Sequence, residues 1–188
     1  MLTIGKPVVS ALILPFVPSP NDDLISLLNE LKRGIPLSKN NENPKKKLSE
    51  YLKQNNYFSI KNGCNQGKCG SCTVLLNNNP VLSCLIPLAE IEQTQITTLE
   101  GFMKSDEYVD IEKAFKQKNI NFCGYCNAGK IFITYKIIKH NPFITREEIK
   151  KEVSFLKCNC VELDSFANGI YLACAIRRNR IKDKLHAK

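Results

Sequence analysis

Nine cysteines in 188 residues restrict the folds open to this chain more than any other property of its sequence. The ninth, Cys174, follows Phe166 and Ile170 on one helical stripe, which indicates a small buried side chain rather than a ligand. Two sets of four thiols suggest two metal sites, whereas an odd total argues against a disulfide framework. The two sets are Cys64, Cys69, Cys72 and Cys84, and then Cys123, Cys126, Cys158 and Cys160.

The N-terminal segment predicts a cytoplasmic protein. Its apolar run, Val8 to Val17, is interrupted by Pro15 and lacks a small-x-small cleavage site after it, so we expect no secretory signal. The run is also far shorter than the roughly 20 residues that a membrane-spanning helix needs, so we expect no membrane partner. Because cytoplasmic thiols stay reduced, the cysteines would be free to bind metal.

Residue patterning divides the chain into a mixed α/β part and a helical part, and so predicts an α+β fold. We place the first domain at residues 1–102, an all-helical domain at 103–178 and a basic tail at 179–188. In the first domain we expect a hairpin from 2–4 and 8–14, helices at 24–32 and 48–55, a hairpin from 73–76 and 81–85, and a strand at 96–99.

Beyond about residue 106 the pattern becomes helical, with expected helices at 107–118, 127–140, 145–156 and 164–178. Thr145 and Glu148 have the spacing of a capping box, and Pro142 should end the helix before it. The helix at 127–140 is apolar on nearly all sides, which predicts a position in the core or in a subunit interface.

The first cysteine set has the spacing C-x4-C-x2-C-x11-C, whose opening is the plant-type 2Fe-2S spacing. Four thiolates must converge on two irons while the main chain wraps around them. Gly63, Gly67 and Gly70 supply the backbone freedom that such a loop needs, and Asn65 tolerates positive φ better than most residues.

The second set combines C-x2-C with C-x-C after thirty-one intervening residues. The two turns can meet only if the helices between them fold back, which favours a compact bundle. Four thiolates suit zinc as well as iron-sulfur chemistry, so this set is ambiguous alone. Its pairing with the first set favours a second cluster.

The segments GCNQGKCGSCTVLL, ITTLEG, FCGYCNAG and CNC resemble the iron-sulfur subunit of the xanthine dehydrogenase and molybdenum hydroxylase family, over roughly residues 45–175. The resemblance implies an N-terminal β-grasp ferredoxin-like domain followed by a four-helix-bundle domain, each holding one 2Fe-2S cluster through one cysteine set. It also implies partners, namely a large subunit with molybdopterin and a subunit with FAD, between which this chain passes single electrons. The residues expected around the clusters are Gly63, Gly67, Lys68, Gly70, Gly124 and Tyr125.

Several positions depart from the pattern of that family. Phe122 replaces a glutamine expected to contact the pterin, Val161-Glu162 replaces Thr-Gly, and Asn159 replaces the arginine of C-R-C. Lys68 stands where glycine is more common, and an ammonium near the cluster would raise its potential. Residues 20–47 resemble an insertion.

The formal charge of +9 would fall to about +5 with two clusters of about −2 each. Basic residues at 45–47 and 177–184 lack an aromatic platform, so we interpret them as solvated or as a contact rim and expect no nucleic-acid partner. The alternatives are a structural zinc protein that binds nucleic acid and a stand-alone 2Fe-2S redox sensor. An iron and sulfide assay distinguishes the zinc protein from an iron-sulfur subunit. Co-purification with large subunits distinguishes the redox sensor from an electron-transfer subunit.

Overall fold

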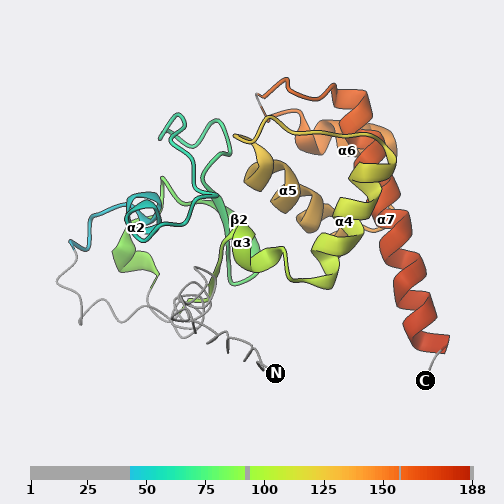
Figure 1. Cartoon of the computed structure of the whole chain (residues 1–188), viewed down its shortest axis with the longest axis horizontal. Helices are drawn as coiled ribbons and strands as arrows, with labels where there is room; N and C mark the ends of the chain where they lie inside the picture. Colours follow the sequence, from blue (N-terminus) through green and yellow to red (C-terminus); the bar gives the residue numbers. More distant parts are fainter. Residues whose placement is uncertain (1–42, 92–93, 157, 187–188) are drawn as a thin grey trace, which may run out of the picture.

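The computed structural model describes residues 43–91, 94–156 and 158–186 (Figure 1). The hairpin expected at 2–14 and the helix expected at 24–32 lie outside these residues. So does most of the proposed insertion at 20–47.

The first part of the described chain contains a small antiparallel sheet with the strand order β2-β1-β3. The strands are β1 (Thr73–Leu76), β2 (Asn79–Leu82) and β3 (Ile96–Thr97). Asn77 and Asn78 have φ of 49° and 63°, and Leu76 pairs with Asn79, so a two-residue turn with both central φ positive joins β1 to β2. The second strand therefore begins earlier than expected from the sequence.

Helix α2 (Leu48–Gln54) and the short helix η2 (Leu88–Glu90) belong to the same part of the chain. Their apolar side chains share one core with β1 and β3. The strand expected at 96–99 is shorter than predicted, because Leu99 begins helix α3 (Leu99–Phe102). The side chains at the centre of this core, each at most 1% exposed, are Leu48, Leu52, Val74, Leu88, Ile91 and Ile96.

Four helices make up the second part: α4 (Asp106–Gln117), α5 (Asn127–His140), α6 (Arg146–Val153) and α7 (Leu163–His186). Helix α7 contacts the other three, and α4 also contacts α5 (Figure 1). Ten residues of α5 are buried, which confirms the expectation of a core helix. The capping box at Thr145 and Glu148 is present, although α6 ends at Val153, before the predicted Leu156.

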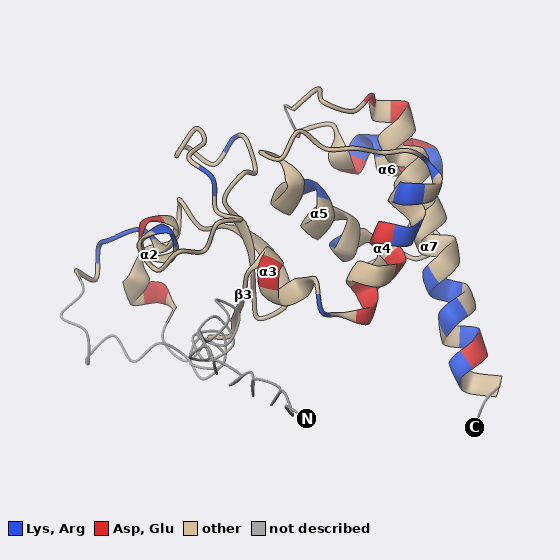
Figure 2. Cartoon of the chain, viewed as in Figure 1, with Lys and Arg blue, Asp and Glu red and all other residues tan. Residues whose placement is uncertain are grey.

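Helix α7 extends past its expected end at Arg178 to His186, so most of the expected basic tail is helical. The reason is electrostatic, because basic residues of α7 form ion pairs with acidic residues of α4. Figure 2 colours the basic segments of α7 blue and the acidic segments of α4 red. The ion pairs are Arg177–Glu107 at 2.8 Å, Arg180–Asp110 at 2.7 Å and Lys184–Asp106 at 2.7 Å. The interpretation of these residues as solvated or as a contact rim is therefore wrong for Arg177 and Arg180, whose side chains are 19% and 23% exposed, whereas Lys184 pairs at the surface and stays solvated.

Of these ion pairs, the buried pair Arg180–Asp110 is expected to contribute most to the stability of the fold. The Asp110 side chain is only 3% exposed, and Arg180→Met leaves it with Arg177 alone, at 3.7 Å. Breaking a buried pair in this way should lower the free energy of unfolding by about 3 kcal/mol. Lys184→Met, which breaks an exposed pair of the same helix, should cost less than about 1 kcal/mol. Urea unfolding measures both, and equal losses would contradict the prediction.

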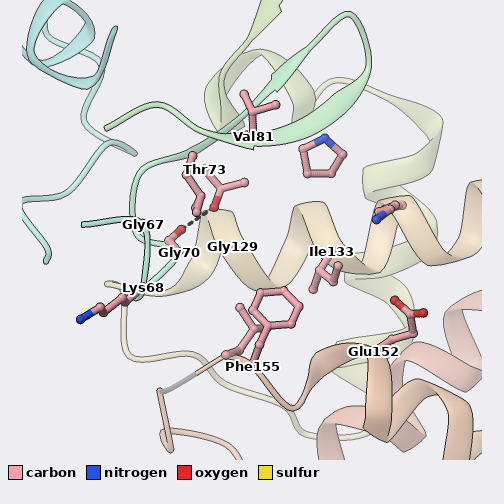
Figure 3. A pocket seen from close by; sticks show the side chains of 13 residues that line it. Gly67, Lys68, Gly70, Thr73, Val81, Gly129, Ile133, Glu152 and Phe155 are labelled. Atoms are coloured by element: carbon pink, nitrogen blue, oxygen red, sulfur yellow. Dashed lines mark hydrogen bonds between the residues drawn. The ribbon is translucent and has the colours of Figure 1, made fainter. Parts of the chain in front are cut away.

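The two parts of the chain meet where α5 packs against β1 and β2. At this junction the backbone of Gly129 of α5 lies against that of Gly70 of the cysteine-rich loop. A Cβ at Gly129 would lie 2.8 Å from the Gly70 carbonyl oxygen, so no side chain fits there. A cleft of about 230 Å³ lies beside this contact, lined among others by Val81, Ile133 and Phe155 (Figure 3).

Candidate metal centres

The loop that carries the first cysteine set wraps around the sulfur of Cys64. Asn65, Gly67 and Gly70 have positive φ (51°, 73° and 74°), as expected for such a loop. This path points the amides of Gln66, Lys68 and Cys69 at Cys64 Sγ, with distances of 3.4, 3.1 and 3.4 Å. These amide hydrogen bonds lower the pKa of Cys64 to about 6, so the loop is built to hold an anionic sulfur.

The four thiols of the first set form two pairs, Cys64 with Cys69 and Cys72 with Cys84. The amide of Cys64 donates to Cys69 Sγ at 3.3 Å, and the two thiols are hydrogen-bonded to each other. Cys72 and Cys84 are buried, at 5% and 4% exposure. Burial, together with a hydrogen bond that the Cys72 thiol donates to the neighbouring Cys84 sulfur, raises the pKa of Cys72 to about 11. Ser83 fixes this pair, because its amide and hydroxyl both donate to the Cys72 carbonyl, at 3.2 and 2.7 Å.

Two pairs of thiols match what a 2Fe-2S core requires, since each of its irons takes two protein ligands. Gly63 adds to the fit, because a Cβ there would lie 2.5 Å from Cys69 Sγ. The first set therefore offers four sulfur donors in two pairs, with amide hydrogen bonds to the first pair. Among the described residues, however, a group of thiols within 4.8 Å of one another is found at the second set and not at the first.

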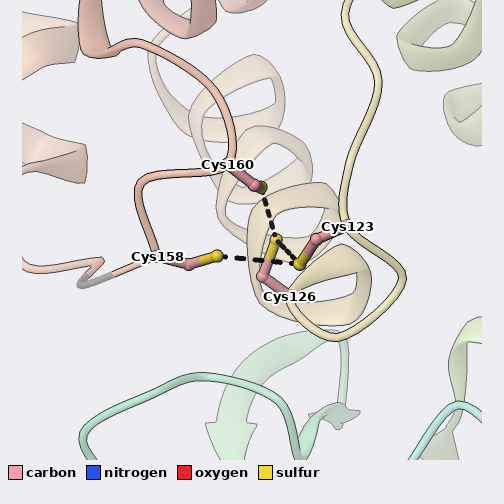
Figure 4. Close-up of side chains that lie close together, drawn as sticks. All are labelled: Cys123, Cys126, Cys158 and Cys160. Atoms are coloured by element: carbon pink, nitrogen blue, oxygen red, sulfur yellow. Dashed lines mark hydrogen bonds between the residues drawn. The ribbon is translucent and has the colours of Figure 1, made fainter.

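The second cysteine set comes together from two turns (Figure 4). Cys123 and Cys126 precede α5, and Cys158 and Cys160 lie between α6 and α7. The four sulfurs lie within 4.8 Å of one another. The individual distances are 3.6 Å for Cys123–Cys126, 3.7 Å for Cys123–Cys158 and 3.3 Å for Cys126–Cys160.

Local backbone geometry shapes the first of these turns. Gly124 has φ of 85°, and its amide donates to Asn127 Oδ1 at 3.1 Å, which ties the turn to the start of α5. A Cβ at Gly124 would meet nothing within 4 Å, so its positive φ, not lack of space, explains the glycine. Amide hydrogen bonds from Cys126 and Tyr125 lower the pKa of Cys123 to about 6.

Lys130 is a residue at the second site that the sequence did not reveal. Lys130 is buried, with 2% of its surface exposed. Its ammonium donates to the Cys158 carbonyl at 3.2 Å and to Cys160 Sγ at 3.4 Å. The only hint in the sequence is a lysine one helical turn after Cys126, inside an otherwise apolar segment. The apolar pattern of that segment predicts a position in the core or in a subunit interface, and gives no sign of a contact with the cysteines.

Three further positions singled out in the sequence can now be placed. The Lys68 amide contacts sulfur, whereas its side chain is exposed and points away from the Gly70–Gly129 contact (Figure 3). Tyr125, which we expected around the cluster, is 56% exposed and so is accessible to a partner surface. Phe122 packs against Phe115 and Phe166, with ring centroids 5.3 and 6.0 Å away, and so belongs to the helical core.

Cys174 is fully buried, which confirms the expectation of a small core side chain. Burial raises the pKa of its thiol to about 11. It lies on α7, among the apolar residues of the helical core.

These pKa values predict an order of reactivity in the chain stripped of iron by a chelator. At pH 7 a thiol with a pKa near 6 is about nine tenths thiolate, so Cys64 and Cys123 should react first with iodoacetamide. Their rates should level off above about pH 7, while those of Cys72 and Cys174 keep rising through pH 9. Mass spectrometry of the folded, alkylated chain measures this order. Early modification of Cys174 would contradict it.

The geometry of the second set alone suits a zinc ion or a 2Fe-2S core, since both take four thiolates. Comparison with known families resolves this ambiguity. A family model described as a 2Fe-2S iron-sulfur cluster binding domain matches residues 19–116. A second model, described as a [2Fe-2S] binding domain, matches residues 98–171 and so includes all four cysteines of the second set.

Individual relatives agree with the family models. The nicotinate dehydrogenase small FeS subunit of Eubacterium barkeri is 33% identical, over 62% of this chain and 75% of that protein. The xanthine dehydrogenase iron-sulfur-binding subunit of Escherichia coli O157:H7 is 32% identical, over 65% of this chain and 79% of that protein.

A solved structure also resembles this chain. Quinoline 2-oxidoreductase from Pseudomonas putida 86 contains a chain with a TM-score of 0.63 and 30% identity, over 73% of this chain and 87% of that one. Among the described helices, none has the length and apolar character needed to cross a bilayer. With both cysteine sets inside matched 2Fe-2S domains, the chain belongs to the family of small iron-sulfur subunits of the molybdenum hydroxylases and serves such an oxidoreductase in electron transfer.

Proposed function

We propose that this chain receives electrons singly from a molybdopterin centre on a large partner subunit and passes them through two clusters to a FAD-binding subunit or another acceptor. Each cluster, when bound, accepts and returns one electron. Cys64, Cys69, Cys72 and Cys84 would hold the first, and Cys123, Cys126, Cys158 and Cys160 the second. In this assignment Cys64 and Cys69 share one iron, and Cys72 and Cys84 share the other.

The proposal includes a domain assignment. Residues 1–102 would form a β-grasp ferredoxin-like domain, supported by the sheet of β1, β2 and β3 around which α2 and η2 share one core. Residues 103–178 would form a four-helix bundle, supported by the contacts that α7 makes with α4, α5 and α6. Reduced thiols at all nine cysteines suit the cytoplasm, where we place the protein.

The observation that carries the proposal is the contact between the two cysteine-bearing segments. Gly70 lies directly after Cys69, and Gly129 lies three residues after Cys126, so their close approach joins the backbones of the two sites. This contact offers an electron a short covalent and van der Waals route from one cluster to the other.

The second site is the end that we expect to face the molybdopterin subunit. Cys123 and Cys160 are exposed there, and so is Tyr125. An exposed cluster edge can exchange electrons only with a partner that docks on it, so this surface should become buried in the complex.

Anaerobic purification of the chain together with its associated subunits tests the proposal. We expect a brown chain with about four irons and four acid-labile sulfides, recovered with a large molybdenum-containing subunit and a flavin-containing one. A colourless chain with zinc would overturn the iron-sulfur assignment. Clusters without any large partner would instead favour the stand-alone redox sensor.

A further inference from the structure

Within the part of the chain that the structure describes, Lys130 is a buried cation without a carboxylate partner. Among residues 43–91, 94–156 and 158–186, the ion pairs formed by Asp and Glu side chains involve other basic residues. The Lys130 ammonium instead lies over the rings of Phe122 and Phe166, 5.4 and 5.2 Å from their centroids. It makes its hydrogen bonds with the turn that carries Cys158 and Cys160.

Burial of a lysine is costly unless a negative charge or hydrogen-bond acceptors compensate it. Two aromatic faces and one carbonyl provide partial compensation. The remaining acceptor is Cys160 Sγ, which becomes a thiolate when it binds iron. An anionic four-thiolate cluster next to Lys130 would therefore supply the missing counter-charge.

On this basis, and resting on the proposed function, we infer that the Lys130 ammonium raises the midpoint potential of the second cluster by donating an N–H···S hydrogen bond to Cys160. Reduction adds one electron from the molybdenum centre and changes one Fe³⁺ to Fe²⁺. The electron is the only particle transferred, and no bond forms or breaks.

The physical reason is that the reduced cluster carries one more negative charge than the oxidised one. A cation buried beside a ligand sulfur stabilises the reduced state more, and the low dielectric of the core strengthens the effect. At the first site no described lysine or arginine side chain is hydrogen-bonded to a cysteine sulfur, because the Lys68 side chain is exposed and only its amide reaches one. Lys130 would thus raise the potential of the second cluster and leave that of the first unaffected.

Lys130 also positions the C-x-C turn, because it donates to the Cys158 carbonyl. A loss of activity in a variant would not separate this structural role from the electrostatic one. The test must therefore measure a potential, and it must include a variant that keeps the charge.

The experiment is a redox titration, followed by electron paramagnetic resonance, of the chain in its complex. In Lys130→Met, which keeps an unbranched side chain but removes the charge, the equilibrium constant for one-electron reduction of the second cluster should fall at least tenfold, or 59 mV. The first cluster should titrate as in the wild type. In Lys130→Arg, which keeps the charge, the same equilibrium constant should stay within threefold of the wild-type value.

Lys139→Met is the matched control, because it removes the same charge from an exposed position of the same helix. It should leave both potentials unchanged. If Lys130→Met does not retain the second cluster, Lys130→Gln, which keeps an uncharged donor, is titrated instead and should show a smaller fall in the same direction.

An unchanged second potential in the uncharged variant, or an equal shift in Lys139→Met, would overturn the inference about Lys130. Those outcomes leave the proposed function standing, because both clusters are then present. A wild-type chain without iron would instead overturn the proposed function.

Discussion

A chain in which Cys126 is replaced by alanine is expected to hold about two irons instead of about four. Cys126 is buried at 5% exposure, and its sulfur lies 3.3 Å from that of Cys160 and 3.6 Å from that of Cys123. No other thiol is placed to replace it, because Cys174 is buried within the helical core. Electron transfer through the complex should fall to background, since the route between the partner subunits is interrupted.

Iron and acid-labile sulfide assays measure this loss, together with the visible spectrum and the number of paramagnetic signals after reduction. The signal that disappears in Cys126→Ala identifies the second cluster, and Cys84→Ala should remove the other signal. Cys174→Ala is the control and should keep both clusters. Full iron content in Cys126→Ala, or iron loss in Cys174→Ala, would refute the ligand assignment.

Local sequence patterns were sufficient for the features that depend on neighbouring residues. The helix at 127–140 has the expected bounds because its apolar run, its preceding turn and Pro142 are all local. The eight cysteines could likewise be sorted into two sets from spacing alone. The pairing of Cys64 with Cys69, and of Cys72 with Cys84, required the path of the loop in space.

Features that depend on distant partners could not be predicted. Helix α7 continues to His186 because α4 supplies acidic partners about seventy residues earlier in the chain. Lys130 is buried because its acceptors come from residues 158 and 160. In the sequence it is one of three lysines in a largely apolar helix, and the other two, Lys136 and Lys139, are exposed to solvent.

Gly129 is another residue whose role depends on a partner distant in the sequence. It is a helical residue without the positive φ that marks Gly67, Gly70 and Gly124, so nothing local explains why it is glycine. The explanation is the backbone of Gly70, which occupies the space of a side chain. Because this contact joins the two cysteine-bearing segments, Gly129 sets how closely the two clusters can approach.

Replacing Gly129 by alanine is therefore expected to separate the two sites while leaving each intact. The new Cβ would lie 2.8 Å from the Gly70 oxygen and 3.3 Å from its carbonyl carbon and Cα, and backbone atoms cannot rotate away as a side chain could. Overpacking of this kind costs about 1 to 3 kcal/mol. Iron content should stay at about four per chain, whereas electron exchange between the clusters should slow and the magnetic interaction between the two reduced clusters should weaken.

The sign of the stability change distinguishes this contact from an ordinary helical site. At an open helix position, Gly→Ala stabilises by up to about 1 kcal/mol, so a loss of stability can arise only from the contact with Gly70. Lys136→Ala, at an exposed position of the same helix, should change stability by less than about 0.5 kcal/mol. Urea unfolding, and relaxation measurements on the doubly reduced chain, give the two readouts. A more stable Gly129→Ala chain with unaltered coupling between its clusters would mean that the two sites communicate by another route.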